Sequence, residues 1–193
     1  MPPTPPSSPD PSALPELLAR HVPLLRAFLR LRMSRQLRSL EESSDLVQTV
    51  CRELLDHRDG FAFRGDAEFR AWLCTAALNK LRERERFWTA EKRDPQRKKE
   101  LVTEDHALAA CYASVLTPSR AAIGKESLER FERAFEELSE QQREVVILVR
   151  LSGLSHAQAA EQLGTTEVAT RSLLHRALVR LTTLLSEPRD SRP

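Results

Sequence analysis

The residues best suited to binding a charged partner lie near the carboxyl end of the chain. Between Arg171 and Arg180 the sequence holds three arginines and one histidine, with no acidic residue. Guanidinium groups bind phosphates and the edge of guanine, and an α-helix that carries them fits the major groove of DNA. The apolar residues of this stretch recur at helical spacing, so its polar residues share the opposite face. The residues expected on this DNA-facing side are Thr166, Glu167, Val168, Arg171, Ser172, His175 and Arg176.

Two short helices joined by a glycine turn would position these residues. Ser155, with Gln158 three residues later, opens the first helix, and Gly164 permits the positive φ of a tight turn. Thr166 supplies the cap of the second helix. This spacing is typical of a helix-turn-helix. A plain helical hairpin with a solvated basic face is the alternative interpretation.

A second basic stretch lies in the first half of the chain. Residues 70–99 contain ten Lys and Arg against four Asp and Glu. Over all 193 residues, Lys and Arg number 30 and Asp and Glu number 28, so the net charge is only +2. That balance excludes a uniformly basic nucleic-acid coat, but it arises because residues 101–140 are acidic. The sequence therefore predicts two separate phosphate-binding faces.

The composition favours helices as the elements that carry both faces. Only 5 residues are glycine and 5% are aromatic, unlike the glycine-turned, aromatic-rich strands of sandwiches and barrels. Apolar residues recur at three- and four-residue intervals over 14–29, 46–55, 69–81, 128–138 and 145–149. We therefore predict an all-α fold. Pro23 lies inside the first of these stripes and is expected to kink or break its helix.

These helices divide into two small domains. The predicted organisation is a disordered, proline-rich tail at 1–12, a helical domain at 13–90, a linker at 91–125, a helix-turn-helix domain at 126–187 and a tail at 188–193. The linker is assigned because periodicity is lost there. Acidic residues predominate between 126 and 140, where we expect a solvated helix face. The alternative is that they fold against a basic domain in an inactive state.

The sequence lacks the patterns of enzymes, metal sites and membrane proteins. The three cysteines form no paired motif and the five histidines are scattered, so no disulfide, metal or cofactor is expected. No catalytic motif is present. The longest apolar run, 145–149, is far too short to cross a bilayer, and the amino terminus has no signal-peptide pattern. We therefore expect a cytoplasmic protein that is not an enzyme.

Three segments resemble the extracytoplasmic-function sigma factors of bacterial RNA polymerase, which belong to the sigma-70 family. GLSHAQAAEQLGTTEVATRSLLHRALVRL at 153–181 resembles the helix-turn-helix with which that family reads promoters. SSDLVQTVCRELLDH at 43–57 resembles its polymerase-clamp segment, and FRGDAEFRAWLCTAALNKLRERER at 63–86 resembles its promoter-melting segment. These segments stand in the family's order, separated by a linker of suitable length.

The resemblance implies a transcription-initiation factor with two partners. It would bind core RNA polymerase, through the clamp helices and the flap, and promoter DNA, reading the minus-35 element with the helix-turn-helix and melting the minus-10 element with the first domain. An anti-sigma factor is a further candidate partner. The polymerase-binding residues implied are Asp45, Leu46, Gln48 and Arg52. Those implied at the minus-10 element, where an unstacked base and phosphates must be held, are Asn79, Lys80, Arg82, Arg84 and Arg86.

Three aromatic residues lie along the promoter-melting segment. Trp72 falls on the apolar stripe and is predicted to be core. Phe87 and Trp88 lie beyond the stripe, and either stacking on bases or packing against the first helix is expected of them.

The reading helix departs from the family's usual sequence. Val168, Ala169 and Thr170 replace the usual Gly-Thr-Val, and Leu173 replaces a usual arginine. The DNA sequence that is read therefore does not carry over. Two rival functions stay open: a regulator that binds duplex DNA without acting as a polymerase subunit, and a sigma-like interaction module that has lost DNA binding. The resemblance in the first domain argues against the regulator.

Overall fold

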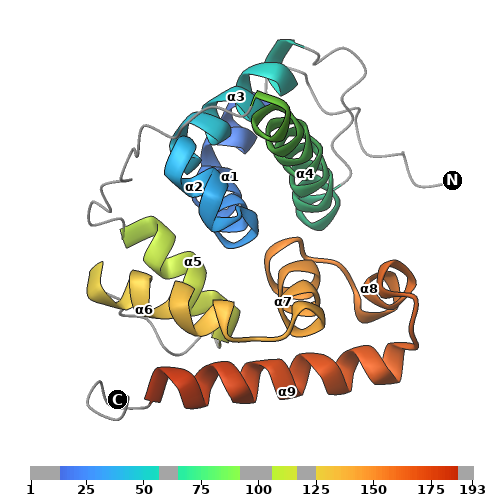
Figure 1. Ribbon diagram of the computed structural model, residues 1–193. Helices are drawn as coiled ribbons and strands as arrows, with labels where there is room; N and C mark the ends of the chain where they lie inside the picture. The colour runs from blue at the N-terminus through green and yellow to red at the C-terminus, as the bar shows by residue number, and fades with distance from the viewer. Residues whose placement is uncertain (1–13, 57–64, 92–105, 117–124, 187–193) are drawn as a thin grey trace, which may run out of the picture.

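The computed structural model describes residues 14–56, 65–91, 106–116 and 125–186, and every regular element in these ranges is a helix (Figure 1). The predicted all-α fold is confirmed. The tails predicted at 1–12 and 188–193 lie outside the described residues. The elements are α1 (Leu14–Arg32), α2 (Arg35–Leu40), α3 (Ser43–Asp56), α4 (Asp66–Glu91), α5 (His106–Leu116), α6 (Lys125–Glu136), α7 (Glu140–Val146), the π-helical turn η2 (Ile147–Leu151), α8 (His156–Leu163) and α9 (Glu167–Ser186).

A first unit is built from α1, α2, α3 and α4. Helices α3 and α4 both pack on α1 and on each other, so that their apolar stripes meet in one core around Leu25, Leu46 and Leu73. Helix α1 runs through Pro23 without a break. Buried side chains on both sides of the proline hold the helix together, although proline removes one backbone hydrogen bond. Of the two outcomes expected at Pro23, the break does not occur.

Helix α5 falls within the segment predicted as a linker. Leu108, Tyr112 and Val115 are buried, and α5 packs against α1, α6 and η2. Its sequence, HALAACYASVL, is apolar or small on nearly every side, so it shows no amphipathic stripe from which a helix could be predicted. The described part of residues 91–125 is therefore a helix within the core, which the loss of periodicity did not reveal.

A second unit comprises α6, α7, η2, α8 and α9. Ser139 and Ser155 form capping boxes with Gln142 and Gln158, and these start α7 and α8. Gly164 ends α8 with a φ of 63°, as the sequence predicts. Helix α9 then lies along the lower edge of the molecule in Figure 1 and packs on α6, α7 and α8. The helix-turn-helix is thus α8, the glycine turn and the start of α9.

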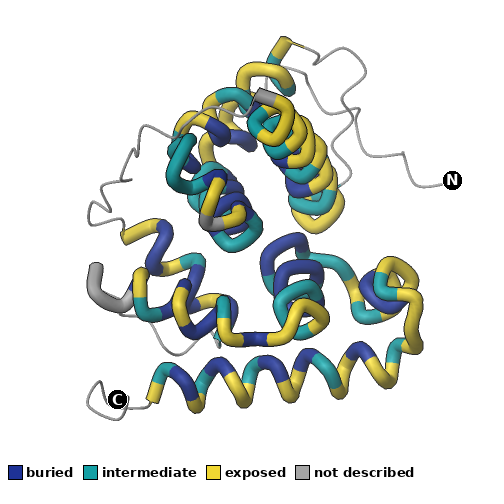
Figure 2. The backbone as a smooth tube through the Cα atoms, viewed as in Figure 1, coloured by how far each residue is buried: buried dark blue, intermediate teal, exposed yellow. Residues whose placement is uncertain are grey.

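The two units are docked on one another. One continuous cluster of buried apolar residues extends from α1 through α5 to α9. Figure 2 marks the buried residues of these helices in dark blue along the backbone. Glu132 of α6 is buried at this contact and pairs with Arg30 of α1, while Glu136 pairs with Arg38. The prediction of a solvated acidic face is wrong for these two glutamates, because arginines of the first unit cover them. Among the described helices, none is long and apolar enough to cross a membrane.

Candidate nucleic-acid interfaces

The start of α9 projects its polar residues away from the core. Thr166 Oγ1 accepts a hydrogen bond from the backbone N–H of Ala169 at 3.2 Å and so caps the helix. Thr170, Leu174 and Ala177 bury the opposite side of α9 against the second unit. This one-sided burial determines which residues of the helix face solvent.

Nearly all the residues predicted to read upstream DNA are on that solvent face. Val168 has 72% of its surface exposed, so its side chain is accessible to a partner. Glu167 is partly buried and forms an ion pair with Arg171 one turn later. The Arg171 side chain nevertheless remains 62% exposed, so its guanidinium is accessible to a base edge. The exposed members of the predicted set are Thr166, Val168, Arg171, Ser172, His175 and Arg176.

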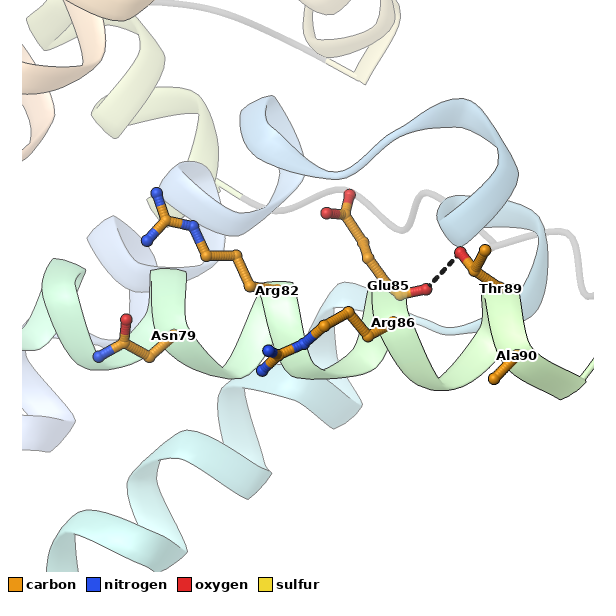
Figure 3. Close-up of a pocket in the computed structure, with 6 residues that line it drawn as sticks. All are labelled: Asn79, Arg82, Glu85, Arg86, Thr89 and Ala90. Atoms are coloured by element: carbon orange, nitrogen blue, oxygen red, sulfur yellow. Dashed lines mark hydrogen bonds between the residues drawn. The ribbon is translucent and has the colours of Figure 1, made fainter.

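Three of the five residues predicted to hold melted DNA line one hollow on α4. Asn79, Arg82 and Arg86 share this hollow of about 780 Å³ with Glu85, Thr89 and Ala90 (Figure 3). The two arginines extend outward from the helix in Figure 3 and are exposed. An open, cationic hollow with an amide beside it suits a phosphate backbone and an unstacked base.

Lys80 and Arg84, the other two, are bound within the protein. Lys80 Nζ lies 2.6 Å from a carboxylate oxygen of Glu53 on α3 and 2.6 Å from one of Glu83. Hydrogen bonding to Glu53, and then to Glu83, raises the pKa of Lys80. Arg84 forms an ion pair with Glu41, the residue that follows α2. These two cations hold neighbouring elements against α4, and they reach a phosphate only by leaving their carboxylates.

The aromatic residues of α4 differ in exposure. Trp72 is 38% exposed, so its prediction as core is wrong: it lies at the edge of the stripe. Trp88 is half-buried and donates a hydrogen bond from Nε1 to Glu41 at 2.9 Å, so it packs within the protein beside the end of α2, whereas the packing expected of it was against the first helix. Phe87 is 44% exposed, with the Arg84 guanidinium 5.1 Å from its ring centre. Its exposed face is suited to stacking on a base.

On α3, three of the four residues predicted to bind polymerase are exposed. Asp45, Gln48 and Arg52 are spaced three and four residues apart, which places them on one side of the helix. Leu46 has only 2% of its surface exposed and fills the core of the first unit. Its prediction as a polymerase-binding residue is wrong, because a side chain that fills the core cannot contact a partner.

Comparison with known proteins places the chain in a family. Residues 17–93 match Sigma-70 region 2, and residues 128–181 match Sigma-70, region 4. The chain is 31% identical over 172 residues to the ECF RNA polymerase sigma factor SigD of Mycobacterium tuberculosis (strain ATCC 25618 / H37Rv), which covers 89% of this chain and 76% of SigD. The chain belongs to the extracytoplasmic-function sigma factors of the sigma-70 family. This sigma factor is not an enzyme, and sigma factors of its family bind core RNA polymerase and promoters.

Further relatives agree with this assignment. The sigma factor is 30% identical over 164 residues to ECF RNA polymerase sigma factor EcfG of Rhodopseudomonas palustris (strain TIE-1), covering 85% of this chain and 80% of EcfG. It is similar in structure to the sigma factor RpoE of Bartonella quintana, solved in complex with the anti-sigma factor NepR: the TM-score is 0.55 and the identity 27%, over 91% of this chain and 98% of RpoE. CnrH, solved with the cytosolic domain of CnrY, has a TM-score of 0.50 and 25% identity, over 91% of this chain and 89% of CnrH.

Sequence reasoning missed part of the lining of the hollow on α4. Thr89 follows Arg86, Arg82 and Asn79 by three, seven and ten residues, so all four lie on one helical face. That spacing is visible in the sequence, but a threonine hydroxyl carries no charge and so does not by itself indicate a phosphate-binding face. No group of three or more His, Cys, Asp or Glu gathers for a metal ion within the described ranges.

Proposed function

We propose that this sigma factor directs core RNA polymerase to promoters by reading the minus-35 element with α9 and opening the minus-10 element with α4. The observation that carries the proposal is the pair of exposed basic faces, one on α9 and one on α4, each within a different sigma-70 region. The chemistry of RNA synthesis belongs to the polymerase. The factor contributes recognition and strand separation through binding energy alone.

At the upstream element, α9 lies in the major groove with its first two turns against the base edges. The Arg171 guanidinium suits the O6 and N7 acceptors of guanine, and exposed Val168 suits the methyl group of thymine. His175 and Arg176, one turn further along, suit phosphates and so position the helix. We call the predicted DNA-binding residues of α9 the reading face, and its remaining members are Thr166, Glu167 and Ser172.

At the downstream element, the hollow on α4 holds a separated strand. Arg82 and Arg86 attract its phosphates, and the Asn79 amide offers hydrogen bonds to the edge of an unstacked base. Phe87 supplies a face for stacking. Lys80 and Arg84 act here chiefly by keeping α4 in place, because both are held by carboxylates of neighbouring elements.

Polymerase binding belongs to α3 in this proposal. Asp45, Gln48 and Arg52 form the surface offered to the clamp helices, and the second unit meets the flap. The factor acts in the cytoplasm, where promoters are transcribed. An anti-sigma factor is a proposed regulator, since the similar sigma factor RpoE was solved in complex with the anti-sigma factor NepR.

Run-off transcription with purified core polymerase and genomic fragments tests the proposal. Adding the factor is expected to create start sites that core polymerase alone does not use. Tight, specific binding of the isolated chain to duplex DNA with no new start site would favour the regulator instead.

A charge-reversal pair tests the polymerase surface. Arg52→Glu alters the exposed face of α3 and is expected to weaken co-elution of the factor with core polymerase. Arg20→Glu makes the same charge change on the exposed side of α1 and serves as the control. Equal losses in the two variants would remove α3 from the polymerase interface.

A further inference from the structure

Glu41, in the short connection between α2 and α3, binds two side chains of α4. Arg84 forms an ion pair with its Oε1, and Trp88 donates a hydrogen bond from Nε1 to the same oxygen at 2.9 Å. The Glu41 side chain is only 10% exposed, although the residue lies between helices. Two donors from α4 therefore converge on one nearly buried carboxylate.

The position of this carboxylate is fixed by its backbone. The N–H of Glu41 donates to the carbonyl of Leu37 at 2.9 Å and so ends α2, and its φ of −134° and ψ of 145° are extended. Ser43, two residues later, is buried at the start of α3. Because the backbone is held on both sides, ordering the Glu41 side chain costs only the entropy of that side chain.

The two side chains that Glu41 binds are also the neighbours of Phe87. The guanidinium carbon of Arg84 lies over the Phe87 ring, 5.1 Å from its centre. The rings of Phe87 and Trp88 meet edge to face, with centres 5.4 Å apart and planes at 82°. Phe87 is nevertheless 44% exposed. One face of the ring is therefore covered by a cation, while much of the ring stays accessible to a partner.

Phe87 borders the hollow on α4. It directly follows Arg86, and Ala90, which also lines the hollow, comes three residues later (Figure 3). Residues three apart are neighbours on the surface of a helix. A strand whose phosphates are held by Arg82 and Arg86 therefore passes beside the exposed Phe87 ring.

Arg84 needs an anchor to stay over the ring. A cation–π contact at a partly exposed site is weak, and an arginine stem has many rotamers to lose. Arg84 is 35% exposed, so water competes for its guanidinium. The Glu41 carboxylate binds the guanidinium and the Trp88 indole at one point, and this fixes both groups against which Phe87 packs.

We propose that Glu41 is a positioning residue for promoter opening: through the two side chains that it binds on α4, it holds the Phe87 ring in the orientation that stacks on an unstacked base. The inference rests on the proposed function, because it takes α4 as the element that opens the minus-10 element. Stacking on an aromatic face tolerates any base. Glu41 therefore affects how readily the strands separate and leaves the preferred sequence unchanged.

Glu41→Gln in the full chain tests this role, because it removes the charge and keeps the shape of the side chain. Opening is measured, with core polymerase present, by the permanganate reactivity of thymines in the minus-10 element. Open complexes are expected to fall by about threefold or more, while affinity for the closed promoter, measured in the cold, changes by less than about twofold. Equal losses in the two measurements would mark a general structural defect and overturn the proposal.

A double-variant cycle identifies the ring as the group through which Glu41 acts. Phe87→Leu removes the aromatic face and keeps an apolar side chain beside Trp88. In the Phe87→Leu background, Glu41→Gln is expected to change opening by less than about 1.5-fold. Glu53→Gln is the matched control, since Glu53 also binds α4 from a neighbouring element, through Lys80 at 2.6 Å, and its effect is expected to be equal in both backgrounds. A loss from Glu41→Gln that Phe87→Leu does not diminish would contradict the proposal.

NMR of the isolated factor separates failure of this inference from failure of the proposed function. The ring current of Phe87 shifts the resonances of the Arg84 side chain, and Phe87→Leu identifies that shift by abolishing it. Glu41→Gln is expected to reduce the shift by about half or more, because the guanidinium leaves the ring for part of the time, whereas Glu53→Gln leaves it unchanged. An undiminished shift in Glu41→Gln would overturn the positioning role. A parent factor that opens no promoter refutes the proposed function, while the NMR comparison still decides whether Glu41 positions the ring.

Discussion

Arg171 is the residue through which base reading is most directly tested. Arg171→Ala is expected to weaken binding of the polymerase–sigma complex to its promoter by about 1–3 kcal/mol, because a bidentate contact to guanine is lost. Fluorescence anisotropy on promoter and scrambled duplexes measures the difference. Arg180→Ala removes another exposed arginine of α9 that lies beyond the reading face, and little change is expected. An equal loss on both duplexes would show that Arg171 contacts phosphate.

Some arginines of α4 are proposed to bind DNA and another to hold the fold together, and the salt dependence of DNA affinity distinguishes these two roles. Arg82→Gln with Arg86→Gln removes both cations from the hollow, and the slope of log affinity against log salt for the open complex is expected to fall by about 1.4. Arg84→Gln is the control, since Arg84 is held by Glu41 and its loss is expected to lower thermal stability while leaving the slope unchanged. Equal slopes in the parent and the double variant would remove Arg82 and Arg86 from the DNA path.

The glycine turn between α8 and α9 determines the orientation of α9, the helix proposed to read the minus-35 element. Gly164 has a φ of 63°, and no atom lies within 4 Å of a Cβ added there. Gly164→Ala is therefore expected to cost about 1–2 kcal/mol in urea unfolding through backbone strain alone. Gly164→Asn should cost less, since asparagine tolerates this conformation better. A larger loss with asparagine than with alanine would point to crowding instead.

At the scale of elements, residues close together in the sequence are enough to predict some helices but not others. The helix-turn-helix could be predicted because caps, glycine and apolar spacing all lie within residues 155–181. Helix α5 could not, because its apolar residues carry no period. Leu46 and Val47 are adjacent and both apolar, so periodicity alone could not decide that both are buried. The carboxylates that bind Lys80 and Arg84 from other elements, Glu53 and Glu41, lie 27 and 43 positions upstream, and no local pattern reveals them. The pair of Lys80 with Glu83, three residues apart, is local.

At the scale of the whole molecule, the acidic and basic segments can be located in the sequence, but the contact between them cannot be predicted from it. Arg30 and Glu132 are 102 positions apart, and an acidic residue on an amphipathic helix is ordinarily solvated. Only the docking of the units brings the pair together. The nearly balanced net charge therefore has a structural meaning: part of the acidic segment neutralises arginines of the first unit, and the exposed faces of α4 and α9 stay basic.

The same docking gives a prediction about stability. Arg30 and Tyr112 both donate hydrogen bonds to Glu132, and the three side chains form a buried polar cluster. Replacing this cluster by Arg30→Met, Tyr112→Phe and Glu132→Leu together removes both of its charges and fills a similar volume. Such exchanges of buried ion pairs for apolar groups are often neutral or stabilising by about 1–4 kcal/mol, which urea unfolding measures. The triple variant is therefore expected to keep the helix content of the parent and to unfold at the same or a higher urea concentration.

Arg30→Met alone is the informative contrast. It leaves Glu132 buried without its bidentate partner, a situation that typically costs about 3–5 kcal/mol if the structure cannot adjust. The single variant is therefore expected to unfold at a lower urea concentration than both the parent and the triple variant. Equal unfolding midpoints in the single variant and the parent would show that the pair of Arg30 with Glu132 contributes little to stability.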